Sequence, residues 1–177
     1  MPHASAPAPS TGPVPVPYAV CFVCTGNICR SPMAASVFRT LVRDAGLDGL
    51  VVVDSAGTDG WHEGDPADPR TDAALKSAGY ETGHTARQFQ ADWFAGRDLV
   101  IALDHGHQRT LRRLAPTPAD ADKVRLLRSY DPDAGDLDVP DPYYGDADGF
   151  VECLTMVEAA SEGLLDAVRD AVEGRAA

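Results

Sequence analysis

The stretch YAVCFVCTGNICRSPMAASVF, residues 18–38, decides the fold. It begins with a short apolar run over 18–23, which is typical of a buried strand. A turn with Gly26 and Asn27 follows, and apolar residues at helical spacing then predict a helix over 32–46 that ends at a glycine. A strand, a tight turn and a helix in direct succession indicate the first part of a βαβ unit.

The rest of the chain repeats this alternation. Further strands are predicted over 50–55, 98–104 and 123–129, and further helices over 68–80, 105–115 and 148–173. Short, continuously apolar strands that alternate with helices indicate a parallel sheet covered on both faces. We therefore predict one doubly wound α/β domain over 18–177, with a four-stranded parallel sheet and a ligand site at the carboxyl ends of the strands.

Composition and charge narrow the class of protein. The chain has 177 residues and a formal net charge of −12, so neither nucleic acid nor a membrane is expected as a partner. Residues 1–17 are rich in proline and alanine, which predicts a disordered tail. No signal-peptide pattern and no apolar run of membrane-spanning length is present. We expect a cytoplasmic monomer, and export without a recognisable signal stays open.

The four cysteines indicate reduced thiols. They are unevenly spread, and no Cys/His group has zinc spacing, so we expect neither a disulfide scaffold nor a metal or other cofactor. Cys21 lies within a strand and Cys153 within the last helix, and both are interpreted as inert core residues.

The loop from Cys24 to Arg30 predicts an anion site. It joins the carboxyl end of a strand to a helix N-terminus, where unpaired N–H groups and the helix dipole attract negative charge. Gly26 permits close backbone approach, and Asn27 tolerates a left-handed conformation. The planar guanidinium of Arg30 can bind two phosphate oxygens. The same environment favours the thiolate of Cys24, which indicates nucleophilic attack on phosphorus through a phosphocysteine.

In these features the chain resembles the low-molecular-weight protein tyrosine phosphatases. The resemblance covers about residues 18–172. CTGNICRSP, residues 24–32, is similar to the phosphate-binding loop of that family, and DPYYGD, residues 141–146, resembles its general-acid loop. The resemblance implies hydrolysis of phosphotyrosine, with tyrosine-phosphorylated proteins as partners.

The same resemblance implies roles for individual residues of the loop. Cys24 corresponds to the nucleophile, Arg30 to the transition-state clamp and Ser31 to the residue that hydrogen-bonds the thiolate. The phosphate-binding loop would then comprise Thr25, Gly26, Asn27, Ile28, Cys29 and Ser31.

A phosphotyrosine phosphatase also requires a proton donor, because the leaving phenolate has a conjugate acid with a pKa of about 10. The residues alone do not choose among the aspartates that precede the last helix, which are Asp131, Asp133, Asp136, Asp138, Asp141 and Asp146. The resemblance implies Asp141.

Three aromatic residues are implied as walls of the substrate cleft: Trp61, Tyr143 and Tyr144. Trp61 lies among glycine, aspartate and histidine residues, so we expect its side chain to be exposed.

One histidine receives a supporting role. The resemblance implies that His84 holds the phosphate-binding loop in shape together with Ser55 and Asn27. We assign no catalytic role to the other histidines in the body of the chain, which are His62, His105 and His107.

Three alternatives remain in view. Thioredoxin-coupled arsenate reductases share a similar loop but carry two further cysteines late in the chain, whereas only Cys153 follows Cys29 here. Arginine phosphatases typically carry a small threonine where this chain has Ile28. A phosphotyrosine-binding module without turnover would lack the nucleophile or the acid. We therefore expect an active tyrosine phosphatase.

The second thiol of the loop is not needed for hydrolysis. A loop curled around phosphate would bring Cys24 and Cys29 close, and a disulfide requires Cα atoms within about 7 Å. Cys29 could then condense with an oxidised Cys24 and protect it from irreversible oxidation. The resemblance supports this interpretation, because family members carry a paired cysteine here. The alternative is that Cys29 only packs beneath the loop.

Overall fold

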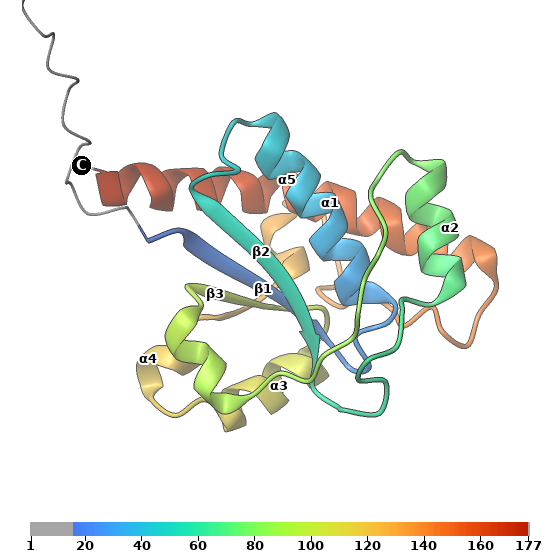
Figure 1. The fold of residues 1–177 in the computed structure, drawn as a ribbon, viewed down its shortest axis with the longest axis horizontal. Coiled ribbons are helices and arrows are strands. Elements are labelled where there is room, and N and C mark those ends of the chain that lie inside the picture. The colour runs from blue at the N-terminus through green and yellow to red at the C-terminus, as the bar shows by residue number, and fades with distance from the viewer. Residues whose placement is uncertain (1–15, 177) are drawn as a thin grey trace, which may run out of the picture.

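A computed structural model describes residues 16–176, so the predicted tail lies outside the described residues up to residue 15. One four-stranded parallel sheet has the order β2-β1-β3-β4 (Figure 1). Its strands are β1 (Tyr18–Cys24), β2 (Val51–Gly57), β3 (Leu99–Ala102) and β4 (Val124–Leu126). The predicted α/β class with a four-stranded parallel sheet is confirmed. Within residues 16–176, no helix has both the length and the apolarity that crossing a membrane requires.

Helices cover both faces of the sheet. One face carries α1 (Arg30–Asp44), α2 (Pro69–Ser77) and α5 (Ala147–Ala176), and the other carries the 3₁₀ helix η1 (Ala91–Gly96), α3 (His105–Leu114) and the short α4 (Pro118–Ala121). Side chains alternate along β1, so Phe22 and Cys24 face the first layer whereas Cys21 and Val23 face the second. Two hydrophobic cores result.

Packing of α1 on the sheet fixes the loop between them. Met33, Val37, Phe38 and Val42 form the buried stripe of α1. The ring of Phe38 meets that of Phe22 edge to face, with 5.6 Å between centroids. Burial of each such side chain contributes about 1.5–3 kcal/mol. The N-terminus of α1 is therefore held at the carboxyl end of β1.

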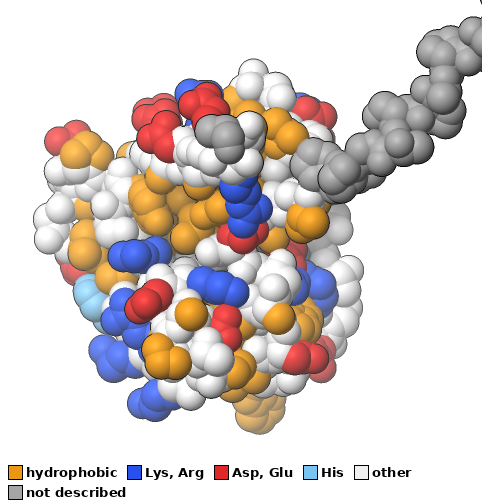
Figure 2. Space-filling view, turned by 90° about the vertical axis from the view of Figure 1, so that its left-hand side faces the viewer, with side chains coloured by type: hydrophobic (Ala, Val, Ile, Leu, Met, Phe, Trp, Pro, Cys, Tyr) orange, Lys and Arg blue, Asp and Glu red, His pale blue; other side chains and the backbone are white. Residues whose placement is uncertain are grey.

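The opposite end of the molecule is closed by the C-terminal turn of α5. The Arg175 guanidinium lies 4.8 Å from the centroid of the Tyr18 ring and forms an ion pair with Asp98. Figure 2 shows the end of the molecule at which the strands begin, where basic, acidic and hydrophobic side chains are interspersed. This face carries no single sign of charge.

Several element boundaries differ from the predictions. The first helix begins at Arg30 rather than residue 32, so Pro32 is its third residue, and it ends at Asp44 because Gly46 has φ +73°. The strand predicted over 123–129 ends at Leu126, where the chain enters the 3₁₀ helix η2 (Leu127–Tyr130) and Leu127 is buried in the core.

Besides η2, two short elements were not predicted, namely η1 and α4. The N-terminus of α4 did carry a signal, because Thr117 precedes a proline and its hydroxyl accepts a hydrogen bond from the backbone N–H of Asp120.

Candidate active site

The backbone of residues 24–30 curls so that its carbonyl groups face outward. Three of these carbonyls accept backbone N–H groups from neighbouring segments: Cys24 from Thr58 at 2.8 Å, Thr25 from Asp59 at 3.0 Å and Ile28 from Asp68 at 2.8 Å. In a trans peptide the N–H points away from the C=O. The N–H groups of the loop are therefore turned toward its interior, next to the N-terminus of α1, as an anion site requires.

Buried Asn27 holds this curl in place. Its φ is +58°, the left-handed conformation that the sequence predicted it to tolerate. Its side-chain nitrogen donates to the hydroxyls of Ser31 (2.8 Å) and Ser55 (2.9 Å), and its side-chain oxygen accepts from the N–H of Arg87 (2.9 Å). His84 Nε2 donates to the Asn27 carbonyl at 2.6 Å. Burial lowers the pKa of His84, which is therefore a neutral donor at pH 7.

Two glycines lie where a Cβ would be crowded by a neighbouring segment. A Cβ on Gly57, the last residue of β2, would lie 2.5 Å from the Thr25 carbonyl oxygen, so only glycine fits there. This role of Gly57 was not predicted from the sequence. A Cβ on Gly26 would lie 3.0 Å from Cδ2 of the His62 ring, which also lines the cleft.

Cys24 begins the loop, and its Sγ lies 2.9 Å from the Ser31 hydroxyl. The other three cysteines are poor candidates for the thiolate that attacks phosphorus. Burial, followed by the charges of Asp68 and Cys24, raises the pKa of Cys29 to about 12. Burial likewise raises the pKa of Cys153 to about 12 and that of Cys21 well above its usual value. All three are protonated thiols at neutral pH, which leaves Cys24 as the candidate nucleophile.

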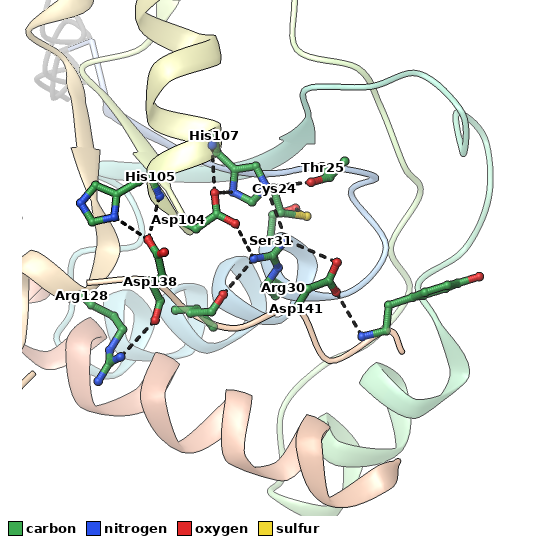
Figure 3. Close-up of polar contacts among 12 residues, drawn as sticks. Cys24, Thr25, Arg30, Ser31, Asp104, His105, His107, Arg128, Asp138 and Asp141 are labelled. Atoms are coloured by element: carbon green, nitrogen blue, oxygen red, sulfur yellow. Dashed lines mark hydrogen bonds and ion pairs between the residues drawn. The ribbon is translucent and has the colours of Figure 1, made fainter. Parts of the chain in front are cut away.

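The Arg30 side chain is buried, and hydrogen bonds fix its guanidinium group (Figure 3). Its Nη1 donates to Asp104 Oδ2 at 2.9 Å and to the Val139 carbonyl at 2.8 Å. Burial would raise the pKa of Asp104, but hydrogen bonds from the His107 N–H and from Arg30, with the charges of both residues, outweigh it and lower that pKa. Asp104 is therefore a carboxylate that balances the buried guanidinium.

Asp104 was not predicted as a site residue, although a signal existed. It lies two residues beyond β3, at the carboxyl end of the sheet where ligand sites of this fold class form.

His107 also contacts the loop, although the sequence analysis assigned it no catalytic role. Its Nε2 lies 2.8 Å from the Thr25 hydroxyl and 3.4 Å from Nη2 of Arg30, and its Nδ1 lies 3.1 Å from Asp104 Oδ1. Burial and the charge of Arg30 lower the pKa of His107 to about 4, despite the nearby carboxylate. The neutral ring can accept a hydrogen bond at Nε2 from the Thr25 hydroxyl or from Nη2 of Arg30.

Among the six candidate aspartates, Asp141 alone lines the cleft over Cys24. Its Oδ2 lies 3.7 Å from Nη2 of Arg30, and its Oδ1 accepts the Tyr143 N–H at 3.1 Å (Figure 3). Asp138 instead contacts His105 Nδ1 at 2.6 Å. Three others accept backbone N–H groups of their own turns: Asp131, Asp136 and Asp146.

The cleft has a volume of about 240 Å³ and lies between the phosphate-binding loop and the loop of Asp141. Trp61, Tyr143 and Tyr144 line its rim. Trp61 is 88% exposed, as expected, and the two tyrosine rings meet edge to face at 5.0 Å. Ile28 lines the cleft as well. Within residues 16–176, no three His, Cys, Asp or Glu side chains are grouped to hold a metal ion.

Comparison with known proteins identifies the family. Residues 19–173 match the family model described as low molecular weight phosphotyrosine protein phosphatase. The chain belongs to this family. Within it, the chain is 72% identical over 162 residues to a low molecular weight protein-tyrosine-phosphatase of Streptomyces coelicolor, across 90% of this chain and 99% of that protein.

Two further members show how far the likeness extends. A low molecular weight protein-tyrosine phosphatase A of Mycobacterium tuberculosis is 49% identical over 152 residues, which is 85% of this chain and 91% of that protein. Among solved structures, a protein tyrosine phosphatase of Entamoeba histolytica superposes with a TM-score of 0.84 at 32% identity, across 87% of this chain and 98% of that one. The family match therefore includes both the phosphate-binding loop and the loop of Asp141.

Proposed function

We propose that this protein is a protein-tyrosine phosphatase that acts through a phosphocysteine on Cys24. The observation that carries the proposal is that Arg30 and Asp141 both line the cleft, with Nη2 of Arg30 3.7 Å from Oδ2 of Asp141, beside the loop that Cys24 begins. One bound phosphate monoester is then within reach of three groups. These are the nucleophile Cys24, Arg30 as a clamp for the phosphate oxygens, and Asp141 as the proton donor.

In the first step the Cys24 thiolate attacks phosphorus and the P–O bond to tyrosine breaks. The loop N–H groups and Arg30 stabilise the charge on the equatorial oxygens. Because Nη1 of Arg30 is held by Asp104 and Val139, the edge with Nε and Nη2 is available for two oxygens. Asp141 donates a proton to the leaving phenolate.

In the second step water attacks the phosphocysteine. The Asp141 carboxylate accepts a proton from that water, the S–P bond breaks, and inorganic phosphate leaves. The Ser31 hydroxyl, 2.9 Å from Sγ, stabilises the departing thiolate by a hydrogen bond.

The cleft supports phosphotyrosine as the substrate. The exposed rings of Trp61 and Tyr144 flank an entrance that suits a flat aromatic group, and Ile28 of the phosphate-binding loop lines the same cleft. We infer that the partners are tyrosine-phosphorylated proteins and that the enzyme acts as a cytoplasmic monomer.

We also propose that the active site is protected by a reversible disulfide. Hydrogen peroxide oxidises the Cys24 thiolate to a sulfenic acid. The Cys29 sulfur then attacks the Cys24 sulfur, so that the S–S bond forms, the S–O bond breaks and water leaves. Proximity supports this step, because Cys24 and Cys29 line the same cleft.

Turnover of four substrates side by side tests the function. Phosphotyrosine, phosphoserine, phosphoarginine and arsenate are compared with reductant and without added metal. Hydrolysis of phosphotyrosine well above the other three is expected. Faster turnover of phosphoarginine, or reduction of arsenate, would contradict the proposal.

A further inference from the structure

Arg70, in the first turn of α2, joins two loops that the proposed mechanism uses. Its Nε and Nη2 donate to the two carboxylate oxygens of Asp68 at 3.0 and 2.9 Å. The other N–H groups reach the loop that follows Asp141: Nη1 donates to the Gly145 carbonyl at 3.0 Å and Nη2 to the Tyr143 carbonyl at 3.1 Å. One planar fork therefore connects α2 with the general-acid loop.

Asp68 fixes the other end of this connection. Its carboxylate caps α2 by accepting the backbone N–H of Arg70 at 2.8 Å, and its own N–H donates to the Ile28 carbonyl at 2.8 Å. Ile28 belongs to the phosphate-binding loop. The two residues thus form a continuous hydrogen-bonded link between that loop and the carbonyl groups beyond Asp141.

Aromatic rings hold the Arg70 guanidinium in its plane. It lies 4.4 Å from the centroid of the Phe150 ring, which is buried on α5, and 5.6 Å from that of Tyr143. Because the guanidinium is stacked as well as hydrogen-bonded, a side chain with the charge alone would not reproduce this geometry.

The segment that carries Asp141 is also anchored on its N-terminal side. The Val139 carbonyl accepts from Arg30 at 2.8 Å, and the Asp138 carboxylate is held by His105. Arg70 supplies the contacts on the C-terminal side, at residues 143 and 145. Asp141 lies between the two anchors, and its Oδ1 accepts the N–H of Tyr143, whose carbonyl binds Arg70.

We propose that Arg70 is a positioning residue that holds Asp141 over the leaving group by linking the general-acid loop to the phosphate-binding loop. Arg70 is not among the residues that line the cleft, so it acts through Asp141. The inference rests on the proposed phosphatase activity.

The variant Arg70→Gln removes the guanidinium that connects the two loops. We expect kcat/KM, which reports formation of the phosphocysteine, to fall about tenfold or more for phenyl phosphate, whose leaving group needs a proton, and by about threefold or less for an activated aryl phosphate. Arg43→Gln is the matched control, because Arg43 forms an ion pair with Glu81 on the surface at 2.7 Å, away from the cleft. It should affect neither substrate.

A double-mutant cycle separates positioning from a loss of overall structure. If Arg70 acts through Asp141, adding Arg70→Gln to Asp141→Asn should lower kcat/KM for phenyl phosphate by no more than about twofold further. Should Arg70→Gln fail to fold, Arg70→Lys carries the same test and is expected to show the same dependence on the leaving group.

The inference would be overturned if Arg70→Gln lowered kcat/KM equally for both substrates. It would also be overturned if the loss from Arg70→Gln added fully to the loss from Asp141→Asn. The same holds if Arg70→Lys behaves as wild type. Failure of the proposed function is a different result, because the wild-type enzyme itself would then not hydrolyse aryl phosphates.

Discussion

Nη2 of Arg30 and Oδ2 of Asp141 lie 3.7 Å apart, although they belong to different loops of the fold. Arg30 is buried and fixed by Asp104 and Val139, whereas the side chain of Asp141 is 41% exposed. A phosphate that enters the cleft would bind the guanidinium edge and bring its leaving oxygen toward Asp141. Arg30, which is rigidly held, thus binds the charged phosphate. Asp141, which is accessible, exchanges the proton.

The dependence of kcat/KM on the leaving group tests the role of Asp141 as proton donor, because kcat/KM reports formation of the phosphocysteine. Asp141→Asn should lower kcat/KM by about 10²–10⁴-fold for a basic leaving group such as phenolate, and by much less for an acidic phenol that leaves without a proton. Rates with a series of substituted phenyl phosphates measure this. Equal losses across the series would mean that Asp141 has only a structural role.

Trp61 should contribute to binding rather than to chemistry, because it is exposed at the rim of the cleft. Trp61→Ala should raise KM for phosphotyrosine peptides by about two- to tenfold, the equivalent of one aromatic contact, and change kcat less. Leu114→Ala, another exposed apolar position, serves as the control. If KM and peptide preference are unchanged, Trp61 does not contact the substrate.

Recovery from peroxide tests the role of Cys29. The wild-type enzyme should be inactivated by hydrogen peroxide, protected by phosphate and restored by reductant, with a Cys24–Cys29 bond found by peptide mass mapping. Cys29→Ser should retain substantial activity when reduced but recover poorly after peroxide. If this variant recovers as fully as the wild type, Cys29 only packs beneath the loop.

His107 should make the protein less stable in acid. Its pKa in the folded state is about 4, below the usual value of 6.5, so the unfolded state binds the proton first as the pH falls. This contribution is present above about pH 6.5 and is lost toward pH 4. Between about pH 7 and about pH 4.5 it should lower the free energy of unfolding by about 2 kcal/mol.

Urea unfolding at these two pH values measures the effect. His107→Asn should show a smaller difference between them than the wild type, whereas His62→Asn, at a more exposed site, should resemble the wild type. The charged groups around His107 are Arg30, Asp104, Asp138 and Asp141, and they remain in both variants. An equal difference in all three proteins would show that His107 is not held neutral by the fold.

The sequence predicted those parts of the site that are local in the chain. Cys24, Asn27 and Arg30 lie in one short loop whose conformation follows from a strand, a turn and a helix start. The left-handed backbone of Asn27 could be anticipated for the same reason.

The contacts that the sequence did not predict join distant segments. Asp104 and His107 approach Arg30 only because β3 lies beside β1 in the sheet, and an Asp-x-x-His spacing has no such meaning by itself. Likewise, the helical pattern over 68–80 predicted α2 but not the direction of the Arg70 guanidinium. Among the aspartates of 131–146, only the folded loop distinguishes Asp141 from its neighbours by physical contacts.

Hydrolysis of phosphotyrosine by Cys24→Ser tests the phosphocysteine mechanism most directly. A serine hydroxyl does not ionise readily in this environment, so the variant should bind phosphotyrosine and release no phosphate above the solvent background. Cys153→Ser, which removes a buried thiol outside the loop, should retain turnover. Measurable phosphate release by Cys24→Ser, in reductant and without added metal, would contradict the assignment of Cys24 as the nucleophile.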